Sequence, residues 1–147
     1  MANRTFIDYS LSLHKRRVTL YFTVNFGAAG APTLQVWDPV ARSFSAATAQ
    51  GWKGIKSLTR VSAGLYDVNL QDAYNQVLNA DMVPVLAAGS FPAATELQLV
   101  TPNLNVNSAT APKIRIQLNN PAGNAATDPA SGEQVQFYFD LSDSTAI

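Results

Sequence analysis

Apolar and polar residues alternate with a period of two along much of this sequence. In residues 17–26, every even position from Val18 to Phe26 is apolar, and the odd positions are mostly polar. Side chains on a β-strand point alternately to its two faces, so this pattern predicts a half-buried strand. Stretches of this kind, separated by Gly and Pro, predict about eight strands. We place them at residues 17–26, 33–37, 55–61, 65–70, 82–88, 96–101, 113–119 and 134–141.

Two segments depart from this alternation. Asp72 can cap a helix, and apolar residues follow it with helical spacing at positions 73, 74, 77 and 78, so we expect one short helix near 72–79. Residues 40–53 are rich in small side chains and are predicted to form a loop. Pro84 cannot donate a backbone hydrogen bond, which makes 82–88 an edge strand or a bulged one.

The chain is predicted to form an all-β fold, a single-domain β-sandwich or barrel that spans residues 17–147. Residues 1–16 precede it as an N-terminal arm with weaker alternation. Such an arm can pair within its own sheet or add a strand to the edge of a neighbouring molecule, and we favour the neighbour.

The composition favours a component of an assembly. Apolar residues make up 47% of the chain and charged residues only 14%, against about 25% charged residues in an average soluble domain. Ten basic side chains balance ten acidic ones, so no overall field attracts nucleic acid or an acidic membrane. Apolar runs are too short for a membrane span. We therefore expect neither nucleic acid nor a membrane as a partner.

The sequence contains no recognisable catalytic or metal-binding pattern. His14 is the only histidine and lies in a basic run, and there is no cysteine. Of the acidic residues, Asp67 is expected to face outward on a strand, Asp72 to cap the helix and Asp81 to lie in a loop. We therefore expect no enzymatic activity, no cofactor and no metal.

The residues most suited to an interface lie in the arm, in the basic run and at two aromatic positions expected to face outward. Aromatic and basic side chains are common in protein interfaces, and an exposed aromatic ring is also what a sugar-binding platform needs. The candidate interface residues are Ile7, Tyr9, Leu11, His14, Lys15, Arg16, Arg17, Trp37 and Tyr138.

Two parts of the sequence, roughly residues 53–79 and 112–145, resemble small structural proteins of tailed-bacteriophage virions. The resemblance is carried by Gly54-Ile-x-Ser-Leu-x-Arg60, Gly64-x-Tyr66-x-Val-x-Leu70-x-Asp72-Ala-Tyr74, Ile114-Arg-Ile-Gln-Leu118, Ala122-Gly-Asn-Ala-Ala-Thr-Asp-Pro-Ala-Ser-Gly-Glu133 and Leu141-Ser-Asp-Ser144. Such proteins decorate capsids or form parts of fibres and tails, and their functional surfaces are interfaces.

The resemblance implies a non-enzymatic capsid decoration (cement) protein that is assembled into virions in the host cytoplasm. We expect it to form a homo-oligomer, for which a trimer is our guess, and to bind the major capsid protein or another virion protein. The alternative is a carbohydrate-binding or fibre/tail module of a phage or an adhesin.

Overall fold

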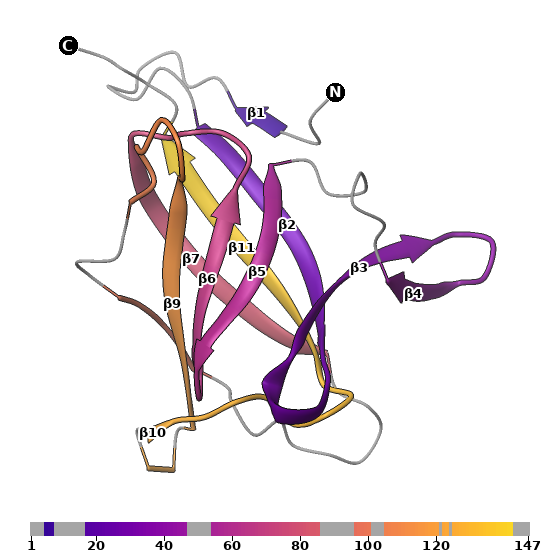
Figure 1. The fold of residues 1–147 in the computed structure, drawn as a ribbon. Coiled ribbons are helices and arrows are strands. Elements are labelled where there is room, and N and C mark those ends of the chain that lie inside the picture. The colour runs from indigo at the N-terminus through magenta and orange to yellow at the C-terminus, as the bar shows by residue number, and fades with distance from the viewer. Residues whose placement is uncertain are drawn as a thin grey trace.

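Two antiparallel β-sheets pack face to face in the computed structural model of this chain (Figure 1). The structure describes residues 5–7, 17–46, 54–85, 96–100, 105–120, 122–123 and 125–142. Sheet A has the strand order β4-β3-β2-β11-β7, and β1 also pairs with β2. Its strands are β1 (Thr5–Ile7), β2 (Arg17–Phe26), β3 (Pro32–Asp38), β4 (Ser43–Ala46), β7 (Gln76–Val85) and β11 (Gln134–Ser142).

Sheet B has the order β10-β9-β6-β5, and β8 pairs with β9. Its strands are β5 (Ile55–Ser62), β6 (Leu65–Leu70), β8 (Glu96–Leu99), β9 (Lys113–Asn120) and β10 (Ala125–Ala126). A single turn of 3₁₀ helix, η1 (Ala28–Gly30), joins β2 to β3.

The core lies between the sheets and is built from the alternating residues of the longest strands. The even-numbered residues of β2 and the odd-numbered residues of β11 from Val135 to Leu141 are at most 1% exposed. The ring of Phe22 stacks on Phe137 and Phe139, with centroids 5.3 and 5.7 Å away. Phe26 meets Tyr66 of sheet B edge-on at 5.4 Å. Complete burial of one such side chain stabilises the fold by about 1.5–3 kcal/mol.

The predicted all-β sandwich is confirmed, and strand 65–70 has the predicted bounds. The structure contains more strands than the eight predicted, because short strands also form at Thr5–Ile7, Ser43–Ala46 and Ala125–Ala126. Part of the predicted loop 40–53 is therefore strand β4, while residues 47–53 lie outside the described part of the chain.

The predicted helix near 72–79 is wrong. Residues from Gln76 onward form β7, which pairs with β11. Just before it, the backbone N–H of Tyr74 donates to the carbonyl of Val106 at 2.7 Å. An isolated helix of this length is marginal in water, whereas the open side of β11 offers a complete ladder of backbone hydrogen bonds. Asp72 therefore caps no helix, and Asp81 lies inside a strand instead of a loop.

The prediction that Pro84 lies on an edge strand is confirmed. β7 is the last strand of sheet A and pairs with β11 alone in that sheet. Proline removes one donor from the ladder, which an edge strand tolerates on its unpaired side.

The arm is predicted to reach a neighbouring molecule, but Thr5–Ile7 pairs with residues 17–19 of its own chain. This side of β2 is open there because β3 pairs only with residues 23–26. The rest of the predicted arm 1–16 lies outside the described residues.

The turn between β5 and β6 depends on Gly64. Its φ of 66° lies in the left-handed region, and a Cβ placed there would come 2.7 Å from the carbonyl oxygen of Leu118. Both the backbone conformation and the space therefore require glycine.

We predict that Gly64→Ala lowers the free energy of unfolding by more than about 1 kcal/mol, because alanine is strained at this φ and clashes with backbone atoms. Urea denaturation followed by circular dichroism measures the change. Gly123→Ala is the matched control, since no heavy atom lies within 4 Å of the added Cβ. Equal effects of the two substitutions would contradict the assignment.

Candidate interaction surface

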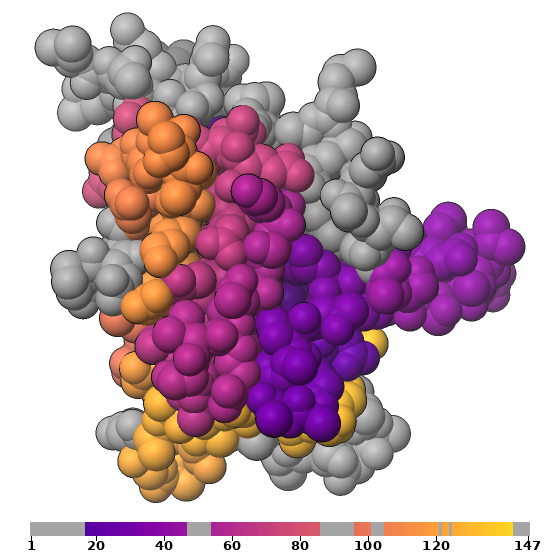
Figure 2. Space-filling model, viewed as in Figure 1, coloured from indigo at the N-terminus to yellow at the C-terminus, as the bar shows by residue number. Residues whose placement is uncertain are grey.

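The β3–β4 hairpin leaves the sandwich and projects from it. β3 pairs with β2 only through residues 32–35, and from Val36 to Asp38 it pairs with β4 alone. Figure 1 shows the hairpin pointing away from the two sheets, and Figure 2 shows it as a purple lobe that stands out from the body. We call residues 36–46 the projecting hairpin.

The hairpin's turn is held by its own side chains. The carboxylate of Asp38 accepts hydrogen bonds from the backbone N–H groups of Val40 and Ala41 at 2.8 and 3.1 Å. This arrangement is an Asx turn, in which a side chain replaces a backbone acceptor. Arg42 then closes the turn with a φ of 51°.

Apolar side chains are exposed along the projecting hairpin. The rings of Trp37 and Phe44 meet edge-on at 5.2 Å. Trp37 is nevertheless 52% exposed, and Val36 and Val40 are 37% and 92% exposed. A two-stranded hairpin is marginally stable by itself in water, and clustered exposed apolar side chains mark interaction sites. The hairpin is therefore the strongest candidate for contact with another molecule.

The outer face of sheet A carries a second group of exposed apolar residues. The rings of Tyr21 and Tyr138 lie 5.0 Å apart, and the Tyr138 hydroxyl is 3.4 Å from Gln136 Oε1. Val83 is paired with Gln136 and is 46% exposed, while Asp81 is paired with Tyr138. We call Tyr21, Asp81, Val83, Gln136 and Tyr138 the tyrosine face. These five residues carry a single charge.

The outer face of sheet B has a different chemistry. Arg115 donates two hydrogen bonds to the Asp67 carboxylate at 2.5 and 2.8 Å, and Lys113 donates one at 2.9 Å. The hydrogen bonds from Arg115, followed by that from Lys113, hold the pKa of Asp67 below its usual value although burial opposes them. This charged face is satisfied within the chain.

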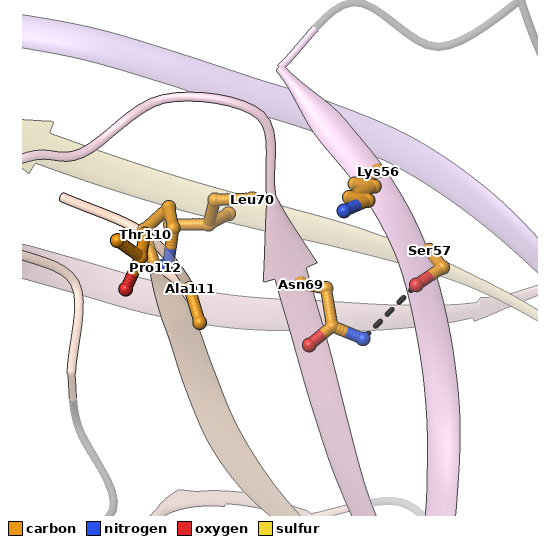
Figure 3. Close-up of a pocket in the computed structure, with 7 residues that line it drawn as sticks. All are labelled: Lys56, Ser57, Asn69, Leu70, Thr110, Ala111 and Pro112. Atoms are coloured by element: carbon orange, nitrogen blue, oxygen red, sulfur yellow. Dashed lines mark hydrogen bonds between the residues drawn. The ribbon is translucent and has the colours of Figure 1, made fainter. Parts of the chain in front are cut away.

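A small pocket lies on sheet B where β5 and β6 approach residues 110–112 (Figure 3). Its volume is about 190 Å³, and Asn69 donates a hydrogen bond to Ser57 Oγ at 2.9 Å across it. Among the lining side chains, only Lys56 is charged. The lining therefore contains no acid–base pair or activated nucleophile of the kind catalysis requires. The pocket is lined by Lys56, Ser57, Asn69, Leu70, Thr110, Ala111 and Pro112.

Among the described residues, no group of three or more His, Cys, Asp or Glu side chains could hold a metal ion. The described part of the chain also contains no helix long and apolar enough to cross a membrane.

The structure separates the sequence-predicted interface residues. Trp37 lies on the projecting hairpin, and Tyr138 lies on the tyrosine face. Ile7 belongs to β1, paired with Arg17. Tyr9, Leu11, His14, Lys15 and Arg16 lie outside the described residues.

Arg17 forms an ion pair with Asp140. Thr19 also donates to this carboxylate, at 2.6 Å. Burial alone would raise the pKa of Asp140, but the hydrogen bonds from Arg17 and Thr19 lower it. Arg17 is therefore engaged within its own chain at the start of β2.

Sequence reasoning missed Arg42, Asp81 and Val83 as surface residues of interest. Asp81 falls in a segment with a wrong assignment, since it is predicted in a loop after the helix and lies in β7. Arg42 lies in a turn, as the predicted loop 40–53 has it, but the strand that follows it is not predicted. The alternation Ser43-Phe44-Ser45 after a turn that begins with Asp38-Pro39 is the signal that could have predicted β4.

Comparison with protein families, with curated protein sequences and with solved structures gave no match to this chain. The fold defines the class: an all-β protein of two antiparallel sheets.

One further cluster joins the segment before β11 to the β5–β6 turn and to the strands β5 and β6. Asp128 accepts hydrogen bonds from Arg60 at 2.7 Å, from the Gly64 backbone N–H at 2.8 Å and from the Tyr66 hydroxyl at 2.7 Å. These bonds, with that of Arg60 the strongest, lower the pKa of Asp128 to about 2. Burial, followed by the hydrogen bond to Asp128, raises the pKa of Tyr66.

We predict that Asp128→Asn lowers the free energy of unfolding at neutral pH by about 1–3 kcal/mol, because Arg60, Gly64 and Tyr66 lose a charged acceptor. An aspartate in an unfolded chain has a pKa of about 3.9. The contribution of Asp128 is therefore complete above that pH and is lost as the pH falls towards about 2.

Urea titrations of both proteins across this pH range test the prediction. The difference in stability between the natural chain and Asp128→Asn should shrink as the solution becomes more acidic. Glu96→Gln serves as the control, because Glu96 is exposed and forms no ion pair with the described residues. A difference that stays constant with pH would refute the role of the carboxylate charge.

Proposed function

We propose that this chain is a non-enzymatic virion structural protein, a capsid decoration (cement) protein that self-associates and binds the assembled shell. The observation that carries the proposal is the projecting hairpin, whose Trp37 is 52% exposed beyond the edge of a well-packed sandwich. A rigid body that offers exposed apolar surfaces with few charges is suited to binding by shape and apolar contact. The low charge of the chain supports the same conclusion.

The mechanism is thermodynamic linkage. A protein that binds the assembled lattice but not its separate subunits stabilises the lattice by RT ln(1 + [L]/Kd). This amounts to about 2.7 kcal/mol per site when the free protein is at a hundred times its Kd. No chemical step is required.

Cryo-electron microscopy of virions from the virus whose genome carries this sequence tests the proposal. We expect repeated density on the capsid surface that fits a two-sheet sandwich with one projecting hairpin. Density only in the tail or fibres would favour the alternative of a fibre or tail module. Virions without the chain would overturn both.

We predict that added protein raises the temperature at which shells lacking the chain come apart. The rise should grow with protein concentration and level off once every site is filled, because only the assembled lattice is bound. Differential scanning calorimetry of shells with increasing amounts of the chain measures it. A transition that does not move would contradict a cementing role.

The half-exposed ring of Trp37 is also the feature that favours the alternative of a carbohydrate-binding module, since sugars stack on exposed aromatic rings. A glycan array separates the two proposals. We expect no glycan binding. Binding that disappears in Trp37→Ala would support the carbohydrate proposal instead.

A further inference from the structure

Each of the two apolar surfaces carries one exposed charge, and these two charges are opposite. The hairpin also contains Asp38, but Asp38 is half-buried and its carboxylate accepts two backbone hydrogen bonds of the turn. Arg42 lies at the turn of the projecting hairpin beside the exposed Val40, and Asp81 lies on the tyrosine face beside the exposed Val83. Both side chains are exposed, and neither forms an ion pair with the described residues. Other aspartates are paired with cations of the same chain, namely Asp67, Asp128 and Asp140.

The backbone of Arg42, like that of Ala29, has a positive φ. Its φ of 51° places it in the left-handed region, which is unfavourable for a residue with a side chain because Cβ comes too close to the following carbonyl oxygen. Glycine is the default residue in this conformation. Arg42 is thus strained and exposed, and its guanidinium has no ion-pair partner among the described residues. These properties support a binding role for Arg42.

The hairpin points away from the two sheets (Figure 1), and Arg42 at its turn is exposed. Asp81 lies on β7, and the strand order places β7 and the hairpin strand β4 at opposite ends of sheet A. Each surface combines exposed apolar side chains with one exposed charge that has no ion-pair partner among the described residues, and these two charges are opposite. The two surfaces are complementary in both respects, and one chain carries both.

We propose that the projecting hairpin of one copy docks on the tyrosine face of a second copy, with Arg42 opposite Asp81 of the second copy. This contact rests on the self-association in the proposed function and identifies the surfaces that produce it. The copies have no net charge to repel one another. Docking also supplies the packing that a bare two-stranded hairpin lacks.

The two surfaces are different patches, so the contact is heterologous. Each docked copy still presents one free hairpin or one free tyrosine face to the next copy. Such contacts repeat until they close into a ring or continue as a chain. A symmetric dimer that uses one patch twice is not expected from this geometry.

Sedimentation velocity of the full chain tests the contact by charge reversal. Arg42→Glu and Asp81→Lys should each weaken self-association at least about tenfold, because each places like charges in the contact. A mixture of the two variants should restore association, since every contact between one variant and the other again joins opposite charges. The double variant should likewise associate nearly as well as the natural chain. Higher salt should weaken association of the natural chain by screening the pair.

Two further variants control the experiment. Lys56→Glu reverses an exposed charge on sheet B and should leave self-association unchanged. Arg42→Gly relaxes the turn and removes the charge, so it should retain a folded circular dichroism spectrum and still associate more weakly. This variant keeps the proposal testable if Arg42→Glu fails to fold.

Three results would overturn the proposal: a natural chain that stays monomeric at every concentration, single reversals without effect, or reversals that neither mixing nor combination rescues. The measurement needs no capsid, so it is separate from the test of the proposed function. A chain that associates through this contact but ignores shells would leave the contact standing and remove the cementing role. A monomer that binds shells would support the cementing role and remove the contact.

Discussion

The pairing of β2 with β11 is the interaction on which the rest of the structure depends. The two strands match over nine residue pairs, from Arg17 with Ser142 to Asn25 with Gln134. Their inward residues, including Phe22 and Phe137, form one half of the core. β3 and β7 are added to the two sides of this pair. A strand far along the sequence from β2 thus occupies the centre of sheet A, and the sheet cannot form without residues 134–142.

The outer faces of sheet A and sheet B differ in their chemistry. On sheet B, Arg115 and Lys113 both form ion pairs with Asp67, so these three charges are satisfied within the chain. On the tyrosine face of sheet A, Asp81 is paired with Tyr138 and lies two residues from the exposed Val83, and its carboxylate accepts only a backbone hydrogen bond, from Met82, among the described residues. An exposed surface with few charges and clustered aromatic rings is the one on which another protein docks at the lowest desolvation cost. The proposed contact uses sheet A for this reason.

Hydrogen bonds to Asp128 hold the end of the sandwich together. Asp128 ties the segment before β11 to the β5–β6 turn through Gly64 and to the core through Tyr66. The acceptor is charged and partly buried, which makes these hydrogen bonds stronger than neutral ones. A body secured in this way can hold the hairpin in a defined direction, and a defined direction is what a repeating assembly requires.

The period of two was enough to predict the core strands, because only a β-strand places every second residue on one buried face. It predicted strand 65–70 with its true bounds and identified Trp37 as an outward residue. It could not assign 72–79, where a few apolar residues fit a helix and a strand equally well. There the open side of β11 decided in favour of β7. The alternation also could not predict which surface residues Arg42 or Asp81 would have as neighbours. Exposed residues come together on one surface only when strands distant in sequence lie side by side. The sequence by itself determined which residues are buried, and the tertiary structure alone decided which exposed residues lie together.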